Sequence, residues 1–138
     1  MDLTQIPFAK MIALKEATSP AYIFELSNDE AYTNHLGTVV AAAQFSLAEF
    51  ATGQWLINAF PDFASNCIPV LRKSDVKFRK PSTGKVSAKI IMDENKIEEI
   101  RMQLTANRRT LINVPVEVHN EDGICIMQGN YEWFIQLT

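Results

Sequence analysis

The chain has 138 residues, of which 47% are hydrophobic and 21% are charged, and its formal net charge at pH 7 is −3. This length and apolar content are sufficient for a compact core, so we expect a single domain over residues 1–138. The slightly acidic balance argues against a general electrostatic attraction to nucleic acid or to anionic membranes.

Cysteine and histidine are scarce in the chain. Cys67 and Cys125 lie far apart and form no Cys-x-x-Cys pair, and His35 and His119 are the two histidines. This pattern indicates neither a structural zinc site nor a disulfide framework. We therefore expect reduced thiols, a cytoplasmic location, and no metal.

The first residues carry four charges that interrupt any signal-peptide hydrophobic region: Asp2, Lys10, Lys15 and Glu16. The apolar run 39–57 approaches the length of a bilayer span, but the polar side chains within it, Glu49 above all, make membrane insertion costly. A buried helix in a soluble protein fits this run better, and we expect no membrane segment.

The first half of the chain predicts a short helix, a strand and a long helix. Residues 5–15 place apolar side chains near helical spacing, and residues 21–26 have the aromatic and branched content of a strand. The long helix follows over residues 39–58, and Pro61-Asp62 ends it.

The second half predicts four strands, over residues 66–80, 85–93, 111–118 and 124–137. Turns and one weakly helical or irregular stretch at 97–104 separate them. The turns are Pro81–Gly84 and Glu121–Gly123. Strands following a helix in this way predict an α+β domain with an antiparallel sheet. A helix that is apolar on nearly every side must be wrapped by a sheet or by a partner chain, so we also expect a dimer.

Glu49 is an isolated carboxylate inside the apolar helix. A charged group in such a setting costs several kcal/mol unless it is paired or neutralised, and acids with perturbed pKa values cluster at functional sites. Ser46, Glu49 and Thr52 share a polar stripe at helical spacing, which we expect to face an active-site slot. The alternative is a structural carboxylate that neighbouring hydroxyls or a dimer partner satisfy.

Two motifs carry a resemblance to a known family. The first is Asn34-x-x-Gly37-Thr38-x-x-Ala41-Ala42-Ala43-x-Phe45-x-Leu47-Ala48-Glu49-x-Ala51-x-Gly53, and the second is Val76-x-Phe78-x-x-Pro81-x-x-Gly84-x-Val86-x-Ala88. Together they resemble the hotdog-fold acyl-CoA thioesterases, specifically the phenylacetyl-CoA thioesterase-like group. The resemblance implies a long central helix wrapped by an antiparallel β-sheet, a homodimer or dimer of dimers, and an acyl-CoA substrate with no cofactor beyond the coenzyme A of that substrate.

In that family an Asn precedes the central helix, a His-Gly-Gly opens it, and an Asp or Glu about two turns later acts as nucleophile or general base. Asn34 and Glu49 match this pattern, whereas Val40-Ala41-Ala42 stand in place of the His-Gly-Gly. The backbone N–H groups of Ala41 and Ala42 can still serve as oxyanion donors, because a helix N-terminus offers free N–H groups whatever its side chains.

The remaining candidates for substrate contact each have a structural alternative. Asn34 either positions the thioester or acts as an ordinary helix N-cap. Gly37 and Thr38 either let substrate approach the backbone or form a turn. Arg79 and Lys80 either meet the phosphates of coenzyme A or are a solvated strand end.

Two other assignments remain open. His35 precedes Glu49 by fourteen positions, a spacing seen in hotdog 3-hydroxyacyl dehydratases, although a loop histidine exposed to solvent is the simpler interpretation. Replacement of the His-Gly-Gly also suggests a non-catalytic module that binds acyl thioesters. The remaining aromatic residues are assigned to the core or to a dimer interface: Trp55, Phe60, Phe63, Trp133 and Phe134.

Overall fold

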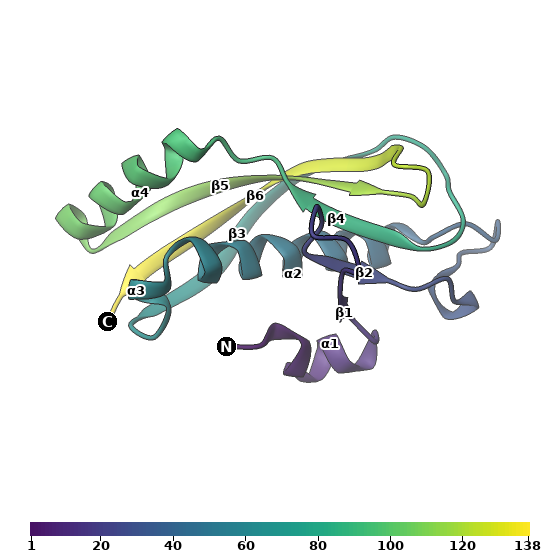
Figure 1. Cartoon of the computed structure of the whole chain (residues 1–138), viewed down its shortest axis with the longest axis horizontal. Helices are drawn as coiled ribbons and strands as arrows, with labels where there is room; N and C mark the ends of the chain where they lie inside the picture. Colours follow the sequence, from purple (N-terminus) through teal and green to yellow (C-terminus); the bar gives the residue numbers. More distant parts are fainter.

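The computed structural model describes residues 1–138, and its centre is a six-stranded antiparallel sheet with one long helix lying across it (Figure 1). The strands follow the order β1-β2-β4-β5-β6-β3 across the sheet. Their bounds are Lys15–Glu16 for β1, Phe24–Leu26 for β2, Cys67–Phe78 for β3, Val86–Ile90 for β4, Arg109–His119 for β5 and Cys125–Leu137 for β6. The predicted α+β class and the four strands of the second half are confirmed.

The long helix α2 (Ala41–Ala59) contacts β2, β4, β5 and β6 and forms the core with them. Leu47, Ala48 and Ala51 are fully buried at this contact. Two alanines there allow the helix backbone to approach the sheet closely, which fills the interior at the density that protein cores require. None of the helices combines the length and the apolar character needed to cross a membrane.

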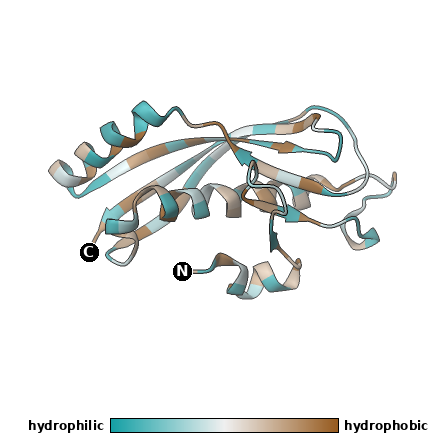
Figure 2. Ribbon diagram, in the orientation of Figure 1, coloured by the Kyte–Doolittle hydropathy of each residue, from teal (hydrophilic) through white to brown (hydrophobic).

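Helix α4 (Glu94–Asn107) occupies the stretch expected to be weakly helical or irregular. It begins where the Asp93 side chain accepts a hydrogen bond from the Asn95 N–H, and it ends at Arg108, whose φ of 59° is left-handed. The sequence signal for this helix is weak because only Ile100 and Leu104 are buried. Hydrophilic and hydrophobic positions are mixed along α4 in Figure 2. Ile100 and Leu104 pack, together with the end of α2, on the first half of β5.

The N-terminal elements are shorter than predicted. Instead of one helix over residues 5–15, a 3-10 turn, η1 (Leu3–Gln5), precedes α1 (Pro7–Met11). Pro7 starts α1 because its fixed φ suits a first helical position, and Ala13 with a φ of 52° prevents continuation. The predicted strand 21–26 is reduced to β2, which pairs with the unexpected short strand β1. Two further short helices, η2 (Glu30–Tyr32) and α3 (Pro61–Ala64), flank α2.

Strand β3 forms one edge of the sheet and pairs only with β6. Its 12 residues are mostly exposed, including Ile68 at 54% and Val70 at 48%. A long unpaired edge with exposed apolar side chains is a template for pairing with another chain.

We predict that Leu104→Ala destabilises the fold by about 2–5 kcal/mol, because it removes a large side chain buried where α4, α2 and β5 meet. Leu104 is 1% exposed, whereas Met102 on the same helix is 66% exposed. Chemical denaturation of both alanine variants checks the prediction. Equal losses for Leu104→Ala and Met102→Ala would contradict the packing of α4.

Candidate functional site

Glu49 lies on α2 in a half-buried position, and no side chain of the protein compensates its charge. Desolvation alone raises the pKa of its carboxyl above 4.5. Together with burial, this charge also raises the pKa of Tyr131 on β6. A carboxyl held in this way is a stronger base than a solvated one, so it is suited to take up a proton from a bound reactant.

Two hydrogen bonds between α2 and β6 fix how α2 is turned about its own axis in the region of Glu49. The Tyr131 hydroxyl donates to the Phe45 carbonyl oxygen at 2.9 Å, and the Trp133 indole N–H donates to the Thr52 hydroxyl at 3.0 Å. Phe45 also packs on Tyr131, with ring centroids 5.1 Å apart. Phe45, Glu49 and Gly53 follow one another at intervals of four residues, so they share the side of the helix that meets Tyr131 and Trp133.

The expected polar stripe is divided between two environments. Thr52 is completely buried, and its hydroxyl donates to the Glu49 carbonyl oxygen at 2.8 Å while accepting from Trp133. The Ser46 hydroxyl donates to the Ala42 carbonyl oxygen at 2.9 Å. Thr52 therefore joins the helix to the sheet, and substrate contact by Ser46 or Thr52 stays a prediction.

An apolar pocket begins one helical turn beyond Glu49. Gly53, Phe60 and Phe63 line it together with the start of β3 and the inward faces of β5 and β6. The sequence predicts a core or interface role for Phe60 and Phe63 and gives no prediction of Gly53 as a site residue. The signal available was the glycine itself, because a glycine inside a helix calls for a packing or functional reason.

The N-terminus of α2 presents free backbone donors. Val40 is the N-cap residue and provides no side-chain hydrogen bond, and no hydrogen bond reaches the N–H groups of Ala41 and Ala42. Both alanines are exposed. The predicted oxyanion donors are therefore available at this helix end.

Asn34 organises the loop that precedes α2. Its Oδ1 accepts hydrogen bonds from the N–H groups of Leu36 at 2.9 Å and Thr38 at 3.1 Å, and its Nδ2 donates to the Thr38 hydroxyl at 3.0 Å. The alternative role as helix N-cap is wrong, because Val40 holds that position. A role for Asn34 in positioning the thioester stays a prediction.

The other predicted contacts lie on two neighbouring loops. Gly37 has a φ of 75°, which a turn requires, and the Val39 N–H beyond Thr38 donates to the Ser82 carbonyl oxygen at 2.9 Å. This bond joins the loop before α2 to the β3–β4 connection, where Arg79 and Lys80 are exposed. The two segments form one end of the molecule, on the right in Figure 1.

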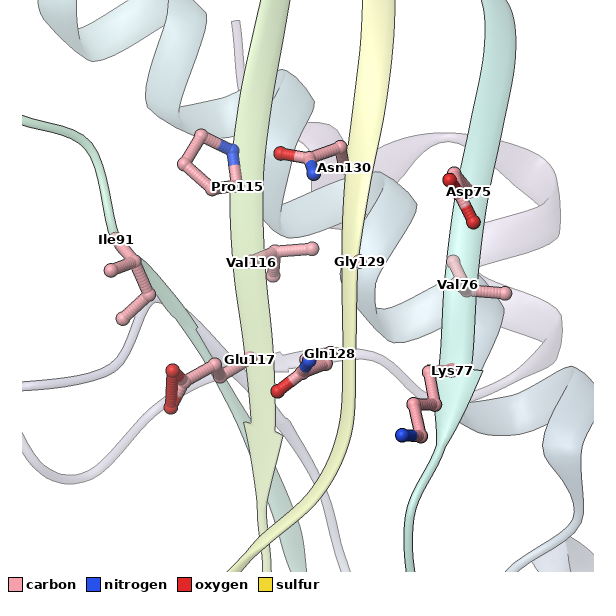
Figure 3. A pocket seen from close by; sticks show the side chains of 10 residues that line it. All are labelled: Asp75, Val76, Lys77, Ile91, Pro115, Val116, Glu117, Gln128, Gly129 and Asn130. Carbon is pink, nitrogen blue, oxygen red and sulfur yellow. The ribbon is translucent and has the colours of Figure 1, made fainter.

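Two further features are separate from Glu49. His35 is exposed in the loop before α2 and makes no hydrogen bond or ion pair with Glu49. A hollow on the outer face of the sheet is open and lined largely by polar side chains, with α2 behind the strands (Figure 3). Neither His35 nor this hollow is therefore part of the candidate site around Glu49.

Comparison with known sequences gives one family. The sequence profile of the family described as "Domain of unknown function (DUF4442)" matches residues 12–135. No curated protein sequence matches the chain.

Comparison with solved structures identifies the fold. A Pseudomonas aeruginosa protein of unknown function named a probable thioesterase, PA5026, superposes with a TM-score of 0.81 at 19% identity, covering 97% of this chain and 89% of that one. The thioesterase HI1161 of Haemophilus influenzae gives 0.69 at 11% identity, covering 98% and 86%. The BH2602 protein of Bacillus halodurans, solved with CoA, gives 0.67 at 17% identity, covering 93% and 74%. At these identities the likeness shows the fold, which is the hotdog fold predicted from the sequence.

We predict that Glu49→Gln stabilises the protein at pH 7. Because the folded pKa of Glu49 is raised, the native state binds the proton more tightly than the unfolded chain does. Stability from this group is fully present below the unfolded value near 4.5 and is lost as pH rises through the folded pKa.

Thermal unfolding of both proteins between pH 4 and pH 8 checks this prediction. The variant's advantage in Tm should be largest at neutral pH and should shrink as pH falls. A variant that is less stable than wild type at pH 7 would show that an unrecognised partner stabilises the charged carboxylate.

Proposed function

We propose that this chain, which belongs to the family described as a domain of unknown function (DUF4442), is an acyl-CoA thioesterase that works as a homodimer. The observation that carries the proposal is Glu49, a half-buried carboxyl with a raised pKa beside an apolar pocket. Its hotdog fold, shared with proteins named thioesterases, supports the same reaction class.

Glu49 acts on the thioester carbonyl in one of two ways. As a general base it takes a proton from a water molecule whose oxygen attacks the carbonyl carbon; the carbon–sulfur bond then breaks and the coenzyme A thiolate leaves with a proton. As a nucleophile its oxygen attacks the same carbon, the carbon–sulfur bond breaks and the coenzyme A thiolate leaves; water then cleaves the resulting anhydride, which frees the acid, regenerates the Glu49 carboxylate and supplies the proton that the thiolate takes up. Both routes need the ionised carboxylate and a donor for the developing oxyanion.

The oxyanion donors come from the partner chain. Ala41 and Glu49 are eight residues apart on one helix, which places their Cα atoms about 12 Å apart along its axis. The free N–H groups at a helix start also point away from the helix, whereas reaction requires donor and base within about 3 Å of the reacting group. One α2 therefore cannot supply both functions, and a second α2 facing it can.

The exposed edge of β3 is the surface on which such a dimer forms. Its backbone groups are free on one side, and Ile68, Val70 and Phe78 are exposed there. Pairing two β3 strands would continue the sheet across both chains and cover these side chains. This surface supports the homodimer, while a dimer of dimers has no separate support.

The pocket and the charged loop suit the two ends of an acyl-CoA. Aliphatic and aromatic side chains line the apolar pocket next to Gly53, which suits an acyl group, and its volume of about 30 Å³ must widen, by movement of its lining or by dimer formation, before the group enters. Arg79 and Lys80 are exposed cations beside the loop that leads into α2, and they meet the phosphates of coenzyme A.

A non-catalytic acyl-thioester binding module is the second candidate. The observation that favours it is Val40-Ala41-Ala42, which stand where the thioesterase group that the sequence resembles carries His-Gly-Gly. This module would retain the pocket and the ligand-induced rise in Tm, but it would release no thiol.

We predict that Glu49→Gln lowers kcat for acyl-CoA hydrolysis by about a hundredfold or more, since the amide can act neither as base nor as nucleophile. Thiol release from short, long and aromatic acyl-CoAs measures the effect. Glu99→Gln is the matched control, because Glu99 is exposed on α4. Turnover that survives in Glu49→Gln would contradict the proposed role, and ligand-induced stabilisation without thiol release in wild type would favour the binding module.

We predict that Val70→Lys produces a monomer without thioesterase activity, because pairing of two β3 strands would place an added charge from each chain in an apolar contact. Light scattering and thiol release on the same sample check both parts. Met102→Lys, an equal change at an exposed site on α4, should stay dimeric and active. An active monomer would exclude a site shared between chains.

A further inference from the structure

The β5–β6 hairpin gathers three potential metal ligands from the short stretch 117–125. Ligand atoms of Glu117, His119 and Cys125 (an oxygen, a nitrogen and a sulfur) all lie within 4.8 Å of one another. His119 and Cys125 are paired across the two strands, and Glu117 lies two residues before His119 on β5. Glu117 borders the outer-face hollow, so this cluster is separate from the pocket beside Glu49 (Figure 3).

The three side chains have the chemistry of a zinc site. Zn²⁺ takes cysteine sulfur, histidine nitrogen and carboxylate oxygen as ligands, in a tetrahedron whose ligand atoms are about 3.3–3.8 Å apart. The present separations require only small side-chain rotations to reach those values. Side-chain exposures of 30% for Glu117 and 12% for His119 leave a route for an ion and for a water molecule as fourth ligand.

Tyr22, in the segment before β2, orients the histidine from the other side. Its hydroxyl lies 2.9 Å from His119 Nδ1, while His119 Nε2 lies 2.8 Å from Glu117 Oε1. The two rings also pack edge to face, with centroids 5.5 Å apart. Metal-binding histidines typically hold the second ring nitrogen in such a hydrogen bond, which fixes the ring for coordination through the first nitrogen.

The Arg79 guanidinium does not occupy the cluster of Glu117, His119 and Cys125. Arg79 approaches from the end of β3, but its guanidinium donates to Gln128 Oε1 at 3.2 Å and forms no ion pair with Glu117. In the metal-free chain His119 Nε2 and Glu117 Oε1 are in direct hydrogen-bond contact at 2.8 Å. A divalent ion placed between these two atoms would also lie within reach of the Cys125 sulfur, because all three ligand atoms lie within 4.8 Å of one another.

We propose that Glu117, His119 and Cys125 form a Zn²⁺ site, oriented by Tyr22, that ties the β5–β6 hairpin to the segment before β2. The expectation from sequence that no zinc site exists rested on the absence of a Cys-x-x-Cys pair. A hairpin produces the same proximity by pairing His119 with Cys125 across its turn.

Titration of Zn²⁺ into the full-length protein, first stripped with a chelator, tests this site by calorimetry. We expect one ion per chain and a rise in Tm with zinc. His119→Ala, Cys125→Ser and Glu117→Gln should each abolish or greatly weaken binding, and Tyr22→Phe should weaken it about tenfold to a hundredfold. The controls are Cys67→Ser and His35→Asn, which change the other cysteine and the other histidine and should bind as wild type does.

Replacement of zinc by Co²⁺ separates ligand loss from misfolding. Wild type and Cys67→Ser should show a thiolate-to-cobalt charge-transfer band, and Cys125→Ser should lose that band while its circular dichroism remains native. No zinc binding by wild type, a band that depends on Cys67, or binding that survives all three ligand substitutions would overturn the proposal.

Discussion

The rotation of α2 against the sheet is the constraint on which the site depends. Leu47, Ala48 and Ala51 bring the helix close to the strands, and the bonds from Tyr131 and Trp133 then set which side of it meets β6. With that rotation fixed, Glu49 is neither fully buried nor free in water. Its raised pKa and its position one helical turn before the apolar pocket both follow from this placement.

Two features of α2 work against stability. Glu49 keeps a charge where desolvation opposes it and no partner compensates it. Gly53 stands inside the helix, although an added Cβ would meet only ordinary contacts of 3.5 Å with Leu3 and Trp133. Glycine in a helix interior costs roughly 0.5–1 kcal/mol relative to alanine. Gly53 lines the pocket and Glu49 lies one helical turn before it, which is where a functional surface departs from what packing alone would favour.

Sequence patterns predicted the regular elements better than their interactions. Alternation in β5 and the apolar run of α2 reflect burial along a single element, so they can be read locally. Helix α4 was underestimated because only Ile100 and Leu104 are buried. The position of Thr52 between helix and sheet, the loop hydrogen bonds of Asn34 and the proximity of His119 to Cys125 depend on contacts between elements, which no local pattern contains.

The central claim is that Glu49 of one chain works with the first N–H groups of the partner's α2. Ala41→Pro removes one of those N–H groups at the first helical position, where proline is tolerated. The measurement is thiol release by a heterodimer of one Ala41→Pro chain and one Glu49→Gln chain, purified with two affinity tags. A shared site predicts that each homodimer is impaired and that the heterodimer regains up to about half of the wild-type activity, because one of its two sites is intact. A heterodimer no more active than either homodimer would contradict the account.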